Sequence, residues 1–177
     1  MTTMTFEERL VDNRARIERL NALARGATAE AQAQIQRHLD AIGHEEESAR
    51  TAARERPAEA EDAFGQLRMR IDVAEQSAAA DLSGDWDQFG AAVLAELRRW
   101  DTYIERLQTR AAAKAGSERP EAEAAISELR RLRITVAERL AELADAPADG
   151  WREQSEPVTT ARRELELKAD ELAMKLR

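Results

Sequence analysis

The chain has 177 residues, which is enough for one large domain or two small ones. Charged residues make up 35% and aromatic residues only 4%, with seven glycines and four prolines, so an ordinary α/β enzyme is not expected. A net charge of −8 disfavours nucleic-acid binding through phosphate neutralisation, and the lack of cysteine excludes disulfides, thiol chemistry and cysteine-based metal sites.

The first part of the chain predicts three helices. The first covers residues 5–25, where Thr5 and Glu8 have the spacing of a capping box. The second covers 28–54, and the third covers 57–81 with a proline in its first turn, where the missing N–H costs nothing. The apolar residues that recur at helical spacing in the second and third helices are Ile35, Leu39, Ile42, Ala49, Phe64, Leu67, Ile71, Ala74 and Ala78.

A break at residues 82–85 precedes a long fourth helix. Asp85 can cap it, with Gln88 three residues further on, and the apolar pattern extends the helix from Trp86 to about Ala115. Its apolar residues alternate in steps of four and three, as in a coiled-coil seam. They are Trp86, Gly90, Val93, Leu97, Trp100, Ile104, Leu107 and Ala111.

Two further helices complete the pattern. The fifth has Pro120 in its first turn and ends near Leu143, before a turn at residues 146–150. Pro157 lies inside the sixth, so that helix either kinks there or begins near Ser155; we favour a short turn at Trp151, a bend, and a long helix from about Glu156. The apolar positions are Ala122, Ala125, Leu129, Leu132, Val136, Leu140 and Leu143, then Trp151, Val158, Ala161, Leu165, Leu172 and Leu176.

The apolar register repeats at an offset of 87 residues. The segment Ile17–Leu20 is identical to Ile104–Leu107, and Asn13 and Phe64 correspond to Trp100 and Trp151. An internal duplication predicts one supersecondary unit per copy. We therefore predict an all-α fold of two tandem three-helix up-down-up bundles, over residues 5–82 and 85–177.

That topology has a geometric consequence. The residues that should meet at one end of the second bundle are Trp86, Leu143 and Trp151, and in the first bundle Phe6, Ala53 and Phe64. Alanine fills many seam positions, and a buried alanine contributes far less than a leucine. The two units are therefore expected to pack together or to pair with a second copy, possibilities that include an elongated homodimer.

No metal site is predicted. His38 and His44 are six residues apart and share a helix face poorly, and neither follows a glutamate by three residues, as a di-metal carboxylate site requires. The run from His44 to Glu47 could attract a cation, but a solvated helix face is the preferred interpretation. Because nucleophile and phosphate-loop motifs are also missing, we predict no catalytic, cofactor-binding or metal-ligating residue and no enzyme activity.

Three other features have two interpretations each. Arg130, Arg131 and Arg133 could bind an anionic surface, but pairing within the helix to Glu128 and Glu138 is preferred. A buried Asn13 could set register, but an exposed side chain near the N-terminus is preferred. The last feature is the set of three tryptophans, Trp86, Trp100 and Trp151. They could form an exposed recognition patch, but burial in the core is preferred.

Two segments carry a family resemblance: Leu97–Leu107 followed by an Ala/Lys tract, and Ile126–Arg130 leading through Leu140–Leu143 to Trp151. The order resembles small bacterial coiled-coil proteins of the stress-associated, apolipoprotein-like type, best over residues 94–177. The resemblance implies a soluble helical protein without a catalytic centre.

We therefore predict a non-enzymatic helical protein that acts by self-association or protein–protein contact, with stress tolerance as its setting. The alternative is reversible binding to a lipid or other apolar surface, although interfacial helices usually carry a basic polar face. Neither a nucleic-acid partner nor a cofactor is expected. The N-terminal residues do not resemble a secretory signal and no 18-residue apolar stretch occurs, so a cytoplasmic location is expected.

Overall fold

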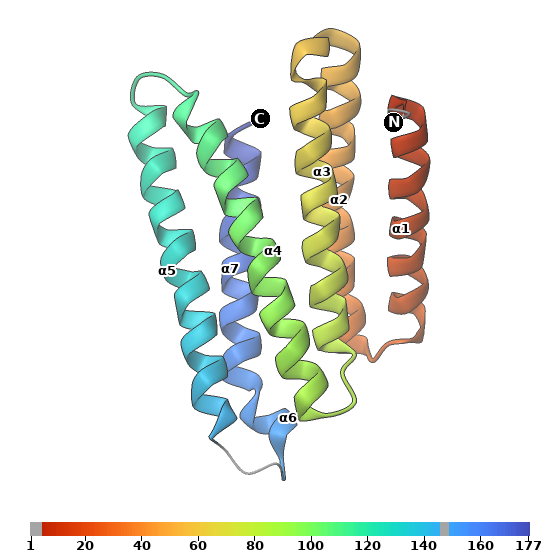
Figure 1. Cartoon of the computed structure of the whole chain (residues 1–177), viewed down its shortest axis with the longest axis vertical. Coiled ribbons are helices and arrows are strands. Elements are labelled where there is room, and N and C mark those ends of the chain that lie inside the picture. Colours follow the sequence, from red (N-terminus) through yellow and green to blue (C-terminus); the bar gives the residue numbers. More distant parts are fainter. Residues whose placement is uncertain (1–4, 146–148) are drawn as a thin grey trace. The chain divides into compact units, whose positions relative to one another are not determined.

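The computed structural model describes residues 5–145 and 149–177, and these residues form helices and no strands (Figure 1). The all-α prediction is confirmed over this part of the chain. Six helices are long and one, α6, is a single turn. They are α1 (Phe6–Gly26), α2 (Ala29–Glu55), α3 (Pro57–Asp81), α4 (Trp86–Ala112), α5 (Glu118–Ala144), α6 (Trp151–Gln154) and α7 (Glu156–Lys175).

Side-chain caps confirm the predicted starts of α1 and α4. The Thr5 N–H donates to the Glu8 carboxylate at 2.6 Å, and the Glu8 N–H donates to the Thr5 hydroxyl at 3.3 Å, which completes the capping box of α1. The Thr5 hydroxyl also donates to the Glu8 carboxylate, at 3.0 Å. The backbone bond from Thr5, and after it this hydroxyl bond, lower the pKa of Glu8 below its ordinary value. At the start of α4, the Gln88 N–H donates to the Asp85 carboxylate at 2.9 Å.

Two helix ends show how turn residues decide a boundary. The fourth helix ends at Ala112, three residues before the predicted Ala115, because its last turn tightens into i to i+3 hydrogen bonds before Gly116, which has a φ of +58°. At the C-terminal end of the chain, α6 is a short turn and α7 begins at Glu156, with Pro157 in its first turn. The predicted bend before Glu156 is confirmed.

The chain divides into two compact units, the first ending at Leu82 and the second beginning at Ser83. In the first unit, α2 packs on both α1 and α3; in the second, α5 packs on both α4 and α7. Consecutive long helices within each unit run antiparallel (Figure 1). Short connections between amphipathic helices produce this arrangement.

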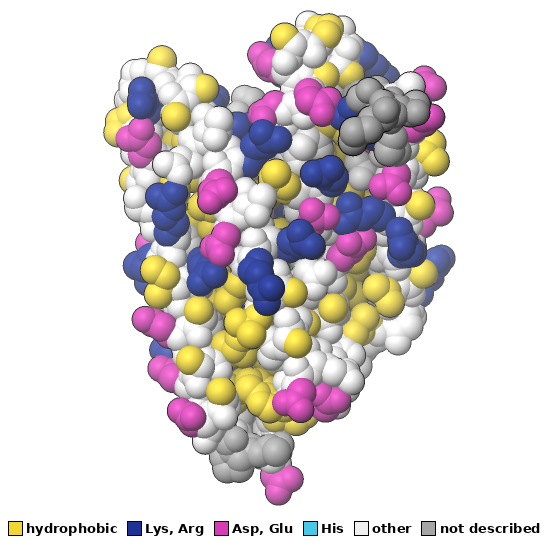
Figure 2. All heavy atoms as spheres, in the orientation of Figure 1, with side chains coloured by type: hydrophobic (Ala, Val, Ile, Leu, Met, Phe, Trp, Pro, Cys, Tyr) yellow, Lys and Arg dark blue, Asp and Glu magenta, His cyan; other side chains and the backbone are white. Residues whose placement is uncertain are grey.

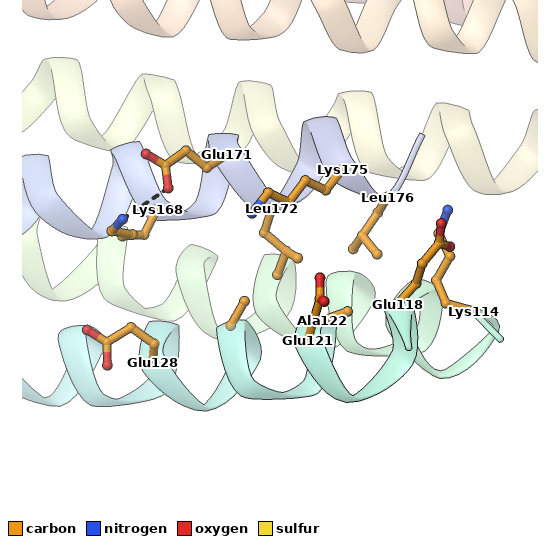
Figure 3. A pocket seen from close by; sticks show the side chains of 11 residues that line it. Lys114, Glu118, Glu121, Ala122, Glu128, Lys168, Glu171, Leu172, Lys175 and Leu176 are labelled. Carbon is orange, nitrogen blue, oxygen red and sulfur yellow. Dashed lines mark hydrogen bonds and ion pairs between the residues drawn. The ribbon is translucent and has the colours of Figure 1, made fainter. Parts of the chain in front are cut away.

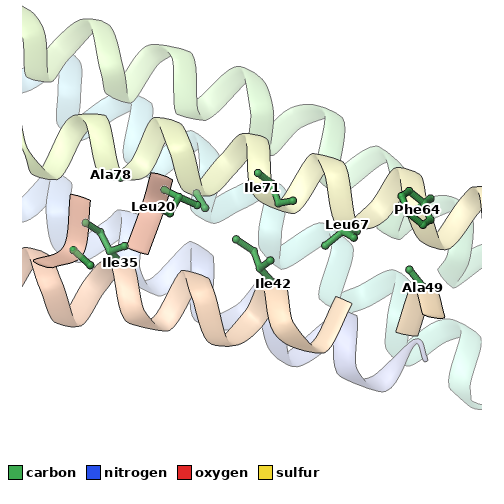
Figure 4. Packing of buried hydrophobic residues seen from close by; sticks show 10 residues of the cluster. Leu20, Ile35, Ile42, Ala49, Phe64, Leu67, Ile71 and Ala78 are labelled. Atoms are coloured by element: carbon green, nitrogen blue, oxygen red, sulfur yellow. The ribbon is translucent and has the colours of Figure 1, made fainter. Parts of the chain in front are cut away.

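The core of the first unit lies where the apolar faces of α1, α2 and α3 meet (Figure 4). Leu20 from α1 and Ile42 from α2 are almost fully buried beside Ile71 from α3. Asn13 is also buried, with 4% of its surface exposed, so the preferred exposed interpretation was wrong. Asn13 lies on the apolar seam of α1, between the partly buried Leu10 and Ile17. This position in the helical register buries its side chain although it is close to the N-terminus.

The core of the second unit centres on Trp100, which is fully buried and meets the Tyr103 ring edge-on at a centroid distance of 5.7 Å. Trp86 and Trp151 are only half-buried, which corrects their assignment to the core. Their rings both pack against Phe89, at 6.0 and 5.6 Å, so Trp86 and Trp151 lie near each other in the second unit. The predicted meeting of both with Leu143 stays a prediction. The matching prediction in the first unit depends on the Phe6 side chain, which lies outside what the structure describes.

Charged side chains of both signs are interspersed on the face shown in Figure 2. Arg16 of α1 donates to Glu75 at 2.7 Å and to Asp72 at 2.5 Å, both on α3. These bonds raise the pKa of the Arg16 guanidinium, and the bond to Glu75 is the largest cause. Among the described residues, no helix is long and apolar enough to cross a membrane.

Candidate functional site

A groove of about 560 Å³ runs between α5 and α7 in the second unit (Figure 3). Its floor is apolar and its two sides are charged. The residues that line this α5–α7 groove are Lys114, Glu118, Glu121, Ala122, Ala125, Glu128, Lys168, Glu171, Leu172, Lys175 and Leu176. The volume falls in the range typical of small-molecule sites.

Small residues on α5 create the groove. Ala122 and Ala125 occupy positions where the rest of that helix places leucine, isoleucine or valine. Opposite them, Leu172 and Leu176 point from α7 toward α5 and are buried (Figure 3). A methyl group facing an isobutyl group leaves the two helices with a depression between them, because the side chains cannot fill the space above the floor.

The two walls differ in charge. Glu118, Glu121 and Glu128 form an acidic wall along α5, whereas α7 alternates Lys168, Glu171 and Lys175. The Lys168 ammonium lies 3.0 Å from the Glu171 carboxylate. The pKa of Glu128 is lowered mainly by its hydrogen bond from Arg131 and less by the charge of Lys168 on the opposite wall.

An exposed pair of apolar side chains lies beside the groove on α7. Leu167 and Met174, which we call the α7 ridge, are 54% and 58% exposed. They are seven residues apart and therefore on one face of the helix, with the groove residue Glu171 between them. Single exposed leucines are common on protein surfaces, and this aligned pair next to a groove is a candidate contact surface.

His38, for which the sequence predicted no functional role, is buried in the first unit. The Arg70 guanidinium donates to His38 Nδ1 at 2.8 Å, so Nε2 carries the proton and donates to the Ser77 hydroxyl at 2.8 Å. His44 is exposed, whereas Glu45 is only 2% exposed. The prediction of a fully solvated face over residues 44–47 was therefore wrong at Glu45.

No group of three or more His, Cys, Asp or Glu side chains that could hold a metal ion occurs in residues 5–145 and 149–177.

The arginine cluster on α5 pairs only partly within its own helix. Arg131 bonds to Glu128 at 2.6 Å, as predicted. Arg133 instead binds Asp101 on α4 through two bonds of 2.8 Å. Arg130 donates to Gln108, which also lies on α4. Two of the three arginines thus join α5 to α4, because a neighbouring helix offers acceptors at the reach of a guanidinium.

Sequence reasoning also missed a second buried row on two helices. On α7, Arg162 lies 2.7 Å from Glu96 of α4, and the same carboxylate accepts a hydrogen bond from the Trp100 indole at 3.2 Å. Each row runs alongside the apolar seam of its helix, displaced from it by one residue, so the spacing of residues in the sequence already contained a signal for it. The rows are Gln66, Arg70, Val73, Ser77 and Ala80 on α3, and Arg162, Glu166, Ala169 and Ala173 on α7.

Comparisons with protein-family models, with curated proteins and with solved structures find no match to this chain. The resemblance to stress-associated coiled-coil proteins therefore stays a prediction.

Proposed function

We propose that this chain is a non-enzymatic helical protein that acts through contact between protein surfaces, with self-association as its mode. The observation that carries the proposal is the α7 ridge beside the α5–α7 groove. A protruding apolar pair and an apolar-floored groove are complementary in shape and chemistry. Helix-in-groove recognition uses side chains at such i and i+7 positions as anchors.

The fold is proposed to come from duplication of a three-helix unit. In support, residues 87 positions apart are buried at matching places in α1 and α4, as Leu20 and Leu107 or Ala24 and Ala111 are. The same holds for Ile71 of α3 and Val158 of α7. Residues 83–177 expressed alone should then give a helical domain with one cooperative unfolding transition, and a helical but non-cooperative fragment would contradict two independent units.

The self-association proposal is tested by the mass of the full chain in solution. Sedimentation velocity over increasing protein concentration should show the average mass rising from that of the 19.8 kDa monomer toward twice that value. A weak, concentration-dependent equilibrium is expected, since a single groove and ridge bury little surface. A mass that stays at the monomer value at every concentration would rule out self-association.

A further inference from the structure

The segment that connects the two units is held by a residue from a distant part of the sequence. It runs from Leu82 to Asp85, between the end of α3 and the start of α4. Leu82 stays attached to α3, because its N–H donates to the Ala78 carbonyl oxygen at 3.0 Å. Ser83 comes next and is only 5% exposed. Its carbonyl oxygen accepts a hydrogen bond of 3.1 Å from the guanidinium of Arg152, which lies on α6.

We propose that this Arg152–Ser83 contact, which we call the α6 clamp, is a conformational device that restricts the connection. The clamp fastens Ser83 to the second unit, so the chain turns freely only at the backbone torsions on either side of the Leu82–Ser83 peptide bond. Hinges in proteins are commonly a few residues that absorb changes in φ and ψ. Release of the clamp would extend the hinge through Ser83 to Gly84. Because the clamp forms within one chain, it is independent of the proposed self-association.

The Trp151 ring holds the guanidinium in position for this contact. The Arg152 Cζ atom lies over that ring, 4.9 Å from its centre, which is a cation–π distance. The ring packs on the buried Phe89 of α4 at a centroid distance of 5.6 Å, and Figure 1 shows α6 beside the start of α4. A planar guanidinium can lie on a ring with its face while it donates hydrogen bonds from its edge. Arg152 therefore reaches Ser83 from a place that a buried side chain fixes.

The backbone of α6 is fixed on both sides of Arg152. Gly150 precedes the turn with a φ of +78°, a left-handed conformation that glycine adopts without strain. The Gln154 side-chain amide donates to the Asp149 carbonyl oxygen at 3.1 Å. The buried Ser155 hydroxyl donates to the Arg152 carbonyl oxygen at 2.7 Å. The Arg152 side chain therefore extends toward the connection from a well-anchored turn.

The two residues after Ser83 are attached to α4 itself. The Gly84 N–H donates to Gln88 Oε1 at 3.2 Å. The Asp85 carboxylate accepts a hydrogen bond from the Gln88 N–H at 2.9 Å. Both bonds come from the first turn of α4, whereas the bond to Ser83 comes from α6. The clamp therefore adds to these local caps a restraint that the sequence around the connection does not itself supply.

Hydrogen exchange of the full chain tests the clamp, read by mass spectrometry over residues 82–89 and, as an internal reference, over residues 97–107 of α4. Arg152→Met removes both the hydrogen bond and the cation from the ring. Residues 82–89 should then exchange about five- to tenfold faster, because the connection and the first turn of α4 open more often. The reference segment should keep its wild-type rate, since the loss of an exposed side chain leaves the core packed.

Two further variants separate the clamp from the general effect of losing an arginine. Arg139→Met removes an exposed arginine of α5 that pairs with Glu142 at 2.9 Å, and it should leave exchange over residues 82–89 unchanged. Arg152→Lys keeps a charged donor on a long side chain but loses the planar group, so it should restore part of the protection. Circular dichroism checks that every variant keeps the helicity of the wild type.

A protease provides a second measurement of the same opening. Endoproteinase Asp-N cuts on the amino side of aspartate, so it can cleave the Gly84–Asp85 bond when the connection opens. Cleavage at this bond should be faster in Arg152→Met than in the wild type by a factor similar to that in hydrogen exchange, because local opening limits both processes.

Each outcome decides for or against the clamp. Faster exchange confined to residues 82–89, with partial recovery in Arg152→Lys, is the expected result. Equal acceleration over residues 82–89 and 97–107 would show that Arg152 stabilises the second unit as a whole, and would overturn the clamp. Unchanged exchange over residues 82–89 in Arg152→Met would overturn it as well, and so would an equal change in Arg139→Met.

Discussion

Asn13 in α1 and Trp100 in α4 are 87 residues apart, at matching places in the apolar pattern of the two helices, and the two units use this place differently. Both side chains are buried, with 4% and 0% of their surface exposed. Helical register therefore decides that the position is covered, whatever residue occupies it. The residue decides how much its burial stabilises the fold, because an indole removes far more apolar surface from water than a carboxamide does.

The buried arginines give a second contrast between the units. In the first, Arg70 donates to the uncharged His38 imidazole; in the second, Arg162 pairs with the Glu96 carboxylate. Removing one partner of a buried ion pair leaves a charge in a poorly solvating environment, and removing the donor to a buried imidazole leaves an unsatisfied acceptor. Loss of the arginine should therefore destabilise each unit by a different route.

The largest expected effect is that of Trp100→Ala. It should lower the free energy of unfolding by about 3–5 kcal/mol, because the cavity lies in the centre of the second unit. The corresponding substitution Asn13→Ala should cost about 1 kcal/mol or less. Urea unfolding monitored by circular dichroism measures both. Equal losses would show that the two positions are not used differently.

The next largest effect is expected for Arg162→Met, which should cost about 3 kcal/mol by leaving Glu96 buried beside Trp100 without this guanidinium. The double variant Glu96→Gln/Arg162→Met should regain much of that loss, since no buried charge remains from the pair. A double-mutant cycle in urea measures the coupling. If the two substitutions are additive, the contact contributes nothing of its own.

A smaller effect is expected in the first unit. Arg70→Met should cost about 1–3 kcal/mol, because His38 Nδ1 loses its donor in a buried site. Arg68→Met is the control: Arg68 is exposed on the same helix, and its loss should change stability by less than about 0.5 kcal/mol. Thermal unfolding of the two variants side by side compares them. A larger loss for Arg68→Met would contradict the contact seen at Arg70.

The smallest effect concerns the start of α1. Thr5→Ala removes the capping box and should speed amide exchange in the first turn by about fivefold, with little change in global stability. Because folding lowers the pKa of Glu8, its contribution is present above the ordinary pKa of about 4.3 and is lost as pH falls through the lowered value. Hydrogen exchange between pH 5 and 3 should therefore show fraying of this turn in the wild type on acidification. In Thr5→Ala the same turn should be frayed at both pH values.

Most helix boundaries could be predicted because they depend on local chemistry. Thr5, Asp85 and Pro157 act through their own backbone and their nearest neighbours, so spacing in the sequence is sufficient. The groove could not be predicted in the same way. Ala122 and Ala125 appear in the sequence as ordinary seam residues, and only the packing of α5 on α7 shows that they leave space above Leu172.

The sequence by itself determined the helical class and the main apolar faces, because periodicity and capping are properties of short segments. Tertiary structure decided which polar residues are buried: Asn13, His38 and Glu45 lie in the interior although their residue types favour water. It also decided that Arg133 reaches across to Asp101 and that Leu167 lies beside a groove. Burial and pairing depend on which helices become neighbours, and no short segment specifies that.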